Sequence, residues 1–499
     1  MDTTLRDGEQ TEGVSFSKEE KFAIAKKLLK DVLVNRIEIT SAKVSEGEKE
    51  TCAQIFSWAK KENLLDKVEV LGFVDNNKSV DWINEAGGKV INLLCKGSKR
   101  HCTLQLKKTP IEHFADITKT IEYAHSLGFI VNAYLEDFSN GIKEDPNYVE
   151  NLINVLIKNK TKRIMLADTL GVLSTKEVSE YVSKVTKKFQ KAHFDFHAHN
   201  DYGLACANCL AAVNAGAKGV HCTVNGLGER TGNAALEEVV ATINDFTEYK
   251  TQINEEKLQS MSRLVELFSK NRISKNKPIV GANVFTQTAG IHADGDKKGN
   301  LYISKLSPKR FGRTTRYALG KLSGKSSIVL TLRNYGIVLE DKQLTEVLKK
   351  VISLGDKKEY VTKEDLLFIV DEVEHNLNTK EFEIIDYKIN VGKNKKPFAK
   401  INVIFKSKKY SFSSFGSGGF DAFICALKKL FKKNKLSFPK LEDYEVRIPI
   451  GGRTDALVET KIIWKKANRT LETIGVSTDQ TEAGIKATEK MVNLVLKLE

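Results

Sequence analysis

The sequence predicts an α/β protein that begins with a (β/α)8 TIM barrel, continues through a helical linker region and ends in a C-terminal α+β domain. Three observations predict this fold. Short apolar, β-branched runs alternate with amphipathic helical stretches over the first half of the chain. Most of these runs are apolar throughout, as expected of parallel strands buried on both faces. From about residue 382 the pattern changes to the alternation typical of antiparallel strands.

The barrel elements are expected in a regular order of strand and helix. Seven strands are expected at residues 33–40, 68–73, 90–94, 130–135, 163–167, 194–199 and 219–224. Eight helices are expected at residues 18–29, 47–61, 79–86, 111–127, 148–158, 175–189, 204–215 and 234–246.

A closed barrel of this type needs eight strands in about 250 residues. The remaining strand must lie at residues 1–4, which is shorter than the usual length of about 5–6 residues. We therefore expect a truncated first strand and hypothesise that Met1 is an internal methionine of a longer native chain. An intact-mass measurement of the endogenous protein would test this hypothesis.

Three domains are expected. Residues 1–260 are assigned to the catalytic barrel, 261–381 to helical linker subdomains and 382–499 to a regulatory domain that binds an amino acid. The last part contains a weak internal repeat of ββα type, in which strands are followed by a glycine turn and a helix. The glycine turns could hold a small carboxylate ligand or be plain structural turns.

The composition indicates a cytoplasmic protein without nucleic-acid or membrane partners. Its net charge is +15, from 79 basic and 64 acidic residues, but the lysines are spread over many expected helices and form no basic arm. No apolar run is long enough to span a membrane. Seven scattered cysteines suit a reducing compartment with free thiols.

Residues able to carry chemistry follow the expected strands where those strands end, which is the active-site face of a (β/α)8 barrel. Five of the eight strand ends carry such groups, a pattern that chance would rarely give. They are Arg6 and Asp7, then Glu136, then Asp168 and Thr169, then His197, His199, Asn200 and Asp201, and finally Asn225, Glu229, Arg230 and Asn233.

The pair His197 and His199 predicts a divalent-metal site. The two residues are two apart on one expected strand, so both imidazoles point to one face. Asp7 is the natural carboxylate partner because the first and last strands close the ring, and Asn233 can add an amide oxygen. The mixed nitrogen and oxygen set suits Zn²⁺, Mn²⁺ or Co²⁺, and Mg²⁺ stays open.

Arg6, beside Asp7, offers a rigid fork for the carboxylate of a 2-oxo acid. The metal would chelate the keto oxygen and one carboxylate oxygen and act as a Lewis acid. A second group must then take a proton from a carbon acid. Glu136 and His292 are candidates for acid–base and hydrogen-bonding roles, although each is as well explained as an ordinary surface residue.

Three strings together resemble the signature motifs of the 2-isopropylmalate, homocitrate and citramalate synthase family. They are DTTLRDGEQ at residues 2–10, FHAHND at 196–201 and NGLGERTGN at 225–233. The strings GIHADG at 290–295 and LGKLSG at 319–324 resemble the family's linker region. The repeat after residue 382 resembles its amino-acid-sensing domain, so the resemblance covers essentially the whole chain.

The resemblance implies an acyltransferase that uses acetyl-CoA as co-substrate. Acetyl-CoA would be enolised, its carbanion would attack the metal-bound 2-oxo acid, and water would hydrolyse the CoA thioester. Asp7, His197 and His199 would be metal ligands, and Asn233 a ligand or near-ligand.

Further roles are implied for residues around the metal. Arg6 would stabilise the oxyanion, Thr169 would bind the substrate carboxylate, and Glu136 would orient or move protons. His292, with Tyr302, would come from the linker of the partner subunit, which requires a homodimer. The residues flanking Tyr302 differ from the commonest family pattern, so its assignment rests on less.

The expected substrate pocket favours a small 2-oxo acid. Tyr134 shares the face of Glu136, and Leu71 and Leu94 end two nearby strands. A tyrosine with two leucines should admit only a methyl group. The strings at 92–98, 134–137 and 168–174 look most like bacterial (R)-citramalate synthases. Pyruvate is therefore expected, with leakage to 2-oxobutyrate because one methylene is worth only about 1–3 kcal/mol.

This resemblance places the reaction at the first step of threonine-independent isoleucine biosynthesis, with isoleucine as the feedback inhibitor. Three alternatives stay open: a 2-isopropylmalate synthase acting on 2-oxoisovalerate in leucine biosynthesis, a catalytically idle amino-acid sensor, and an aldolase or lyase on the same scaffold. Dependence on acetyl-CoA and the choice of 2-oxo acid distinguish them.

Overall fold

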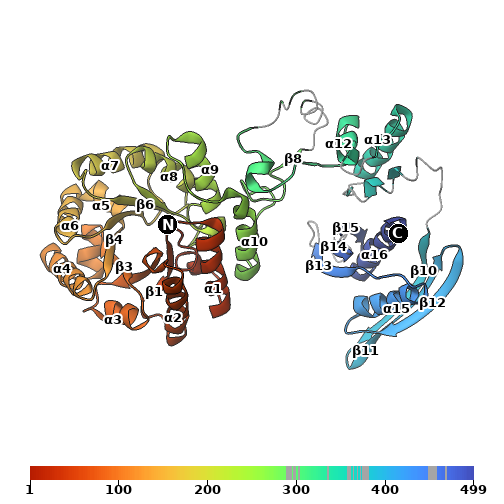
Figure 1. The fold of residues 1–499 in the computed structure, drawn as a ribbon, viewed down its shortest axis with the longest axis horizontal. Coiled ribbons are helices and arrows are strands. Elements are labelled where there is room, and N and C mark those ends of the chain that lie inside the picture. The colour runs from red at the N-terminus through yellow and green to blue at the C-terminus, as the bar shows by residue number, and fades with distance from the viewer. Residues whose placement is uncertain are drawn as a thin grey trace. The chain divides into compact units, whose positions relative to one another are not determined.

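The computed structural model describes residues 1–287, 295, 299, 301, 304–333, 337–356, 361–362, 365–367, 369–370, 373, 381–447, 458–466 and 469–498. The chain divides into two compact units (Figure 1). The first comprises Met1–Phe285 and Ser304–Thr314, and the second comprises Thr286–Ile303 and Thr315–Glu499. The finer predicted division at residues 260 and 381 stays a prediction. Within the described residues, every helix is too short or too polar to cross a membrane.

The first unit is a (β/α)8 barrel, as predicted. Seven parallel strands lie side by side in chain order. Asp2 bridges in parallel to both Ile37 and Cys222, so the first residues close the ring as a very short additional strand. The seven strands are β1 (Ile37–Ser41), β2 (Val68–Phe73), β3 (Val90–Lys96), β4 (Ile130–Glu136), β5 (Arg163–Asp168), β6 (Phe194–Ala198) and β7 (Gly219–His221).

Helices surround these strands (Figure 1). Three of them begin at capping boxes, in which Ser17, Thr109 or Ser174 exchanges hydrogen bonds with a glutamate three residues later. The helices are α1 (Lys18–Lys27), α2 (Glu46–Lys61), α3 (Lys78–Glu85), α4 (Pro110–Ser126), α5 (Phe138–Glu144), α6 (Pro146–Lys158), α7 (Thr175–Lys188), α8 (Ala205–Asn214), α9 (Leu236–Phe246) and α10 (Leu258–Ser269).

The barrel strands present different side chains to their two faces. Ile37 and Ile39 belong to the apolar core of this unit, whereas Glu38 between them is fully buried among polar groups. Asn92 of β3 donates to Glu38 (2.6 Å) and accepts a hydrogen bond from Asn132 of β4 (2.9 Å). The interior of the barrel is therefore partly polar, and this polar interior leads to the site described below.

The second unit contains short linker elements and two antiparallel sheets. Its linker elements are β8 (Thr286–Gln287), β9 (Arg316–Tyr317), α12 (Lys325–Arg333) and α13 (Asp341–Asp356). The first sheet and its helix are β10 (Phe382–Gly392), β11 (Lys395–Phe405), β12 (Lys408–Phe415) and α15 (Gly419–Lys433). The second set is β13 (Lys440–Arg447), β14 (Val458–Lys466), β15 (Arg469–Ser477) and α16 (Gln480–Leu498).

The internal repeat is confirmed, but each unit is βββα rather than the predicted ββα. Two-residue turns separate the first three strands, because Gly392 pairs with Lys395 and Phe405 with Lys408. The second turn has positive φ at both Lys406 and Ser407, the geometry that asparagine and glycine usually supply. The turn lacks those residues, so the sequence pattern did not indicate that one strand ends and another begins there. The second glycine turn of the repeat was expected at residues 475–479, but Gly475 lies within β15.

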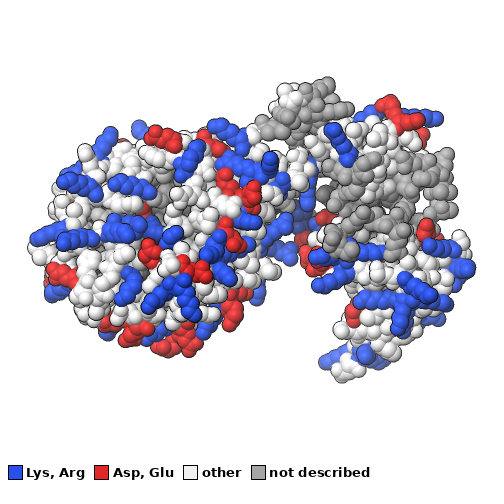
Figure 2. Space-filling view, viewed as in Figure 1, with Lys and Arg blue, Asp and Glu red and all other residues white. Residues whose placement is uncertain are grey.

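Lysine and arginine side chains are interspersed with acidic ones over the visible face of the barrel unit (Figure 2). On this face they form no continuous basic surface, which agrees with the even spread of lysines along the sequence.

Candidate active site

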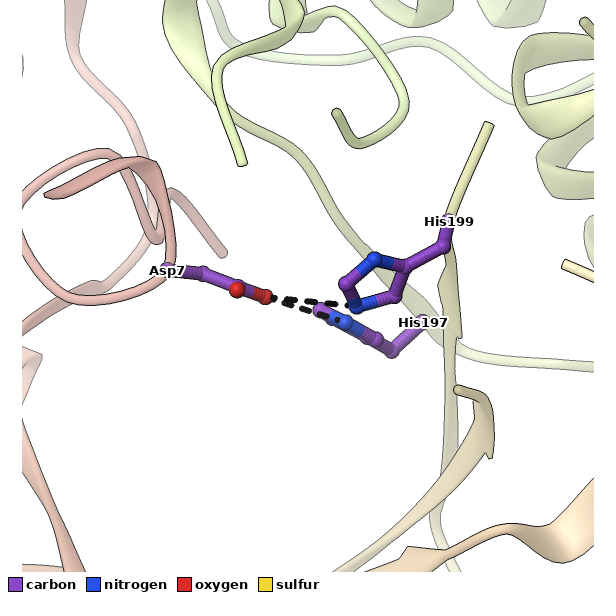
Figure 3. Close-up of side chains that lie close together, drawn as sticks. All are labelled: Asp7, His197 and His199. Atoms are coloured by element: carbon purple, nitrogen blue, oxygen red, sulfur yellow. Dashed lines mark ion pairs between the residues drawn. The ribbon is translucent and has the colours of Figure 1, made fainter. Parts of the chain in front are cut away.

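Asp7, His197 and His199 meet at the carboxyl end of the barrel strands. Asp7 precedes a short 3-10 helix (Gly8–Gln10), His197 lies in β6 and His199 directly follows β6. The carboxylate oxygen Oδ2 of Asp7 lies 3.1 Å from Nε2 of His197 and 3.8 Å from Nε2 of His199 (Figure 3). These three side chains supply one carboxylate oxygen and two imidazole nitrogens within 4.8 Å of one another. The predicted metal-binding residues are thus brought together.

The environment keeps the Asp7 carboxyl and the His199 imidazole in the forms that bind metals. Burial opposes ionisation of Asp7, but the Arg6 guanidinium and both imidazoles outweigh it and lower the pKa of that carboxyl. Burial, reinforced by His197, lowers the pKa of His199 to about 4, so its ring is neutral near pH 7. An ionised carboxylate and a neutral imidazole are the forms that coordinate a cation.

Asn233 lies next to the two histidines. It forms an antiparallel bridge with His199, and its Nδ2 donates to the carbonyl of Leu227 (3.1 Å). Within the described part of the chain, the buried Asn233 Oδ1 has no hydrogen-bond partner, and Asp7 Oδ2 has only its ion-pair contacts with Arg6 and the two imidazoles. Buried oxygens are rarely left unpaired in folded proteins, so Asn233 Oδ1 fits coordination of a divalent cation beside the Asp7 carboxylate.

Arg6 is held beside the cluster by a carboxylate that the sequence analysis missed. Its Nε lies 2.5 Å from Oε2 of Glu38, and its Nη1 lies 3.5 Å from Oδ2 of Asp7. Its Nη2 also donates to the Tyr134 hydroxyl (3.3 Å). Arg6 is nearly buried, so its charge is only weakly screened by solvent. In the sequence, this partner of Arg6 was indicated only by a single glutamate, Glu38, inside an apolar strand.

The predicted pocket residues pack together. Leu71, Tyr134, Met165 and Ala167 form one small buried cluster, against which Leu94 packs. Leu94 pairs with Tyr134 in the register of β3 and β4. Since Tyr134 also contacts Arg6, this apolar cluster adjoins the charged site, and it contains the two leucines and the tyrosine that were expected to restrict substrate size.

Glu136 and Thr169 lie at the ends of neighbouring strands. Glu136 ends β4 and forms an ion pair with Lys96 at the end of β3, a partner that the sequence analysis did not identify. Thr169 follows β5, and its hydroxyl oxygen accepts a hydrogen bond from the backbone of Asp137 (2.8 Å). Within the described residues this hydroxyl is seen only as an acceptor, so its proton can be donated to a ligand. His292 and Tyr302 lie outside the described residues.

A further polar chain extends from Tyr134 toward the amino end of the strands. The Tyr134 hydroxyl lies 3.1 Å from Nδ1 of His221, and Nε2 of His221 lies 3.2 Å from Oδ2 of Asp195. Asp195 in turn pairs with Arg36. Burial lowers the pKa of His221 to about 3, although Asp195 opposes this. In the sequence, this series of polar contacts was indicated only by single polar residues within apolar runs.

Comparisons with known proteins identify the family of the chain. The HMGL-like family matches residues 1–265, the homocitrate synthase post-HMGL domain-like family matches 279–359, and the LeuA allosteric (dimerisation) domain matches 360–496. The (R)-citramalate synthase CimA of Methanocaldococcus jannaschii is 35% identical over 499 residues, which cover 99% of each chain.

Two further relatives cover nearly the whole chain. A putative (R)-citramalate synthase CimA of Archaeoglobus fulgidus is 34% identical over 99% of each chain. The 2-isopropylmalate synthase of M. jannaschii is 34% identical over 99% of this chain and 94% of that enzyme. All three come from archaea, so the expected likeness to bacterial enzymes finds no support here. The chain belongs to the HMGL-like family and, within it, to the 2-isopropylmalate, homocitrate and citramalate synthases, as its motifs predicted.

Proposed function

We propose that this protein is a divalent-metal-dependent acyltransferase that condenses acetyl-CoA with pyruvate and water to give (R)-citramalate and CoA. The observation that carries the proposal is the meeting of Asp7, His197 and His199 beside Arg6, next to a small cluster of buried apolar side chains. The three metal-binding residues and Arg6 suit activation of a 2-oxo acid. The apolar cluster suits a methyl substituent.

Asp7, His197 and His199 would hold the cation, with Asn233 Oδ1 as a further oxygen donor. A bound divalent cation would supply Lewis-acid polarisation of the 2-oxo group. Which of Mn²⁺, Zn²⁺, Co²⁺ or Mg²⁺ serves is a question of ligand preference, and two imidazoles favour the first three.

The protein's own side chains would supply charge stabilisation, substrate binding and proton transfer. The Arg6 guanidinium stabilises the negative charge that develops on the former keto oxygen, and Glu38 holds Arg6 in place. The Thr169 hydroxyl donates to the substrate carboxylate. Glu136, oriented by Lys96, takes a proton from the acetyl methyl carbon or returns one to the product. His292 and Tyr302 assist from the linker of the partner subunit.

Pyruvate is favoured because Leu71, Leu94 and Tyr134 pack into one buried cluster beside Arg6, which leaves little room for a branched substituent. The names of the first two relatives above, an (R)-citramalate synthase and a putative one, support the same substrate. The alternative is 2-isopropylmalate synthase activity on 2-oxoisovalerate, which the third relative's name supports. That substrate needs room for two more methyl groups than pyruvate.

The match to an allosteric dimerisation domain over residues 360–496 supports a homodimer with feedback control. A cytoplasmic location is part of the proposal and rests on the scattered cysteines of the sequence. Isoleucine is the inhibitor we propose, since (R)-citramalate formation would begin its synthesis.

Release of free CoA tests the proposal. The full-length protein, stripped of metal and then supplied with Mn²⁺, Zn²⁺, Co²⁺ or Mg²⁺, is incubated with acetyl-CoA with and without pyruvate. We expect CoA release that needs both pyruvate and metal. An idle amino-acid sensor would release no CoA, and a lyase would turn over substrate without acetyl-CoA. Either result would reject the proposed reaction.

A further inference from the structure

The Tyr134 hydroxyl has one proton and three polar neighbours. Arg6 Nη2 lies 3.3 Å away, Glu38 Oε2 3.3 Å and His221 Nδ1 3.1 Å. A guanidinium can only donate and a carboxylate can only accept. The direction of the single hydroxyl proton therefore depends on whether Glu38 or His221 accepts it.

Glu38 is already satisfied by other donors. Its Oε2 accepts from Arg6 Nε at 2.5 Å, and its Oε1 accepts from Asn92 Nδ2 at 2.6 Å. Both contacts are shorter than the 3.3 Å that separates Glu38 from the Tyr134 hydroxyl. Glu38 and Arg6 also lie on the same side of this hydroxyl, because they contact each other. A proton aimed at Glu38 would thus point toward the Arg6 side.

His221 can accept the hydrogen bond from the Tyr134 hydroxyl. Its Nε2 faces Oδ2 of Asp195, whose carboxylate is completely buried and also paired with Arg36. A carboxylate accepts only, so the ring proton lies on Nε2 and leaves a lone pair on Nδ1. The Tyr134 proton then points to His221, and the oxygen lone pairs face the Arg6 guanidinium.

We propose that His221 is a positioning residue for the condensation: by accepting the Tyr134 proton, it turns the Tyr134 oxygen toward Arg6 and fixes this guanidinium beside Asp7. Asp195 sets the ring tautomer that makes this possible. The inference rests on the proposed function, because it gives Arg6 its role. It adds a residue that packs against His197, with ring centroids 5.5 Å apart, and that acts on the site through the Tyr134 and Arg6 side chains.

Two substitutions at one position separate the two ring nitrogens. His221→Gln places an amide near the Nε2 position, where it can still donate to Asp195, and removes the acceptor for Tyr134. His221→Asn keeps a polar atom near the Nδ1 position and gives up the reach to Asp195. Each change is made in the full-length wild type and in Tyr134→Phe, which lacks the hydroxyl. Melting temperature and bound metal per chain are measured on every variant.

We expect kcat/KM for pyruvate to fall about tenfold in His221→Gln and by less than about threefold in His221→Asn. The loss should lie in kcat, with the KM for acetyl-CoA unchanged. In Tyr134→Phe, adding His221→Gln should change kcat/KM by less than about twofold, because residues that act through one contact are not additive.

A second readout does not depend on activity. In protein labelled with ¹⁵N-histidine, the His221 signals are identified by their absence in His221→Gln, and they should show the Nε2–H tautomer. Tyr134→Phe should shift the Nδ1 signal, since Nδ1 loses its hydrogen bond.

The proposal is overturned if His221→Gln matches the wild type, if it loses the same factor with and without the Tyr134 hydroxyl, or if bound metal falls in step with activity. A protonated Nδ1 would also overturn it. If the wild type releases no CoA with pyruvate, the proposed function fails and this inference fails with it. Normal wild-type release together with unaffected variants rejects the role of His221 alone.

Discussion

At the scale of single residues, the site consists of charged groups that are buried but paired. Asp7 faces Arg6 and two imidazoles, and Glu38 faces Arg6 and Asn92. A buried charge that loses its partner costs several kcal/mol, so each member depends on the others. Substitutions that remove charge while conserving shape are therefore the informative ones.

Asp7→Asn should weaken metal binding by about 100-fold, because an amide replaces the carboxylate of the proposed metal site, which faces both imidazoles. Calorimetric titration of the metal-stripped protein with Mn²⁺ or Zn²⁺ measures this. Asp31→Asn, at a carboxylate with 49% exposure, is the matched control and should bind like the wild type. Equal affinity in Asp7→Asn would remove Asp7 from the metal site.

Glu38→Gln should lower kcat/KM for pyruvate by about 10- to 100-fold, since hydrogen bonds between charged groups contribute about 1.5–3 kcal/mol. The loss reflects a guanidinium that is no longer held beside Asp7. Glu69→Gln is the control, because Glu69 is equally buried and pairs with Arg36 instead. Steady-state kinetics on both variants decide the matter, and equal losses in the two would show a general effect of removing buried charge.

At the scale of elements, the strands and helices of the barrel could be predicted because their apolar patterns are regular. Asp7, His197 and His199 could be predicted from their places at strand ends. Glu38 and His221 could not, because one sequence does not show which polar residues in different strands meet inside a barrel. The turn at Lys406 and Ser407 was missed because its residues are atypical for positive φ.

The loop that carries Asn233 gives a prediction at this scale. In Gly232→Ala the new Cβ would collide with the carbonyl oxygen of Gly226, and φ at this position is +88°. We expect weaker metal binding and a lower melting temperature, because the loop must move. Gly13→Ala separates strain from collision, since Gly13 has φ +78° and nothing within 4 Å of an added Cβ.

Gly13→Ala should therefore destabilise by the backbone strain alone, about 1–2 kcal/mol, and leave metal affinity unchanged. The measurements are melting temperatures and metal titrations on both variants. Wild-type metal affinity in Gly232→Ala would show that this loop does not position Asn233 for the metal.

At the scale of the whole molecule, the barrel carries the metal residues, and we propose that a partner chain's linker completes the site. The described residues of the second unit include two βββα repeats, and the match to a dimerisation domain covers this part of the chain. Such an arrangement would couple amino-acid binding, dimerisation and catalysis.

Mixing two inactive proteins tests completion of the site across the dimer. Asp7→Asn has a defective barrel and an intact His292, whereas His292→Asn has the reverse. If subunits exchange, half of the dimers are mixed and each has one complete site, so about a quarter of wild-type activity should return. Size-exclusion chromatography verifies that the mixed dimers form. Mixed dimers without activity would show that His292 acts within its own chain.

The proposed preference for pyruvate is tested by comparing two substrates. Acetyl-CoA-dependent CoA release is measured on the metal-loaded full-length protein, and kcat/KM for pyruvate is divided by kcat/KM for 2-oxoisovalerate. We predict a ratio above about 30, because Leu71, Leu94 and Tyr134 must exclude two methyl groups at about 1–3 kcal/mol each. A ratio below one would contradict the account and make the protein a 2-isopropylmalate synthase.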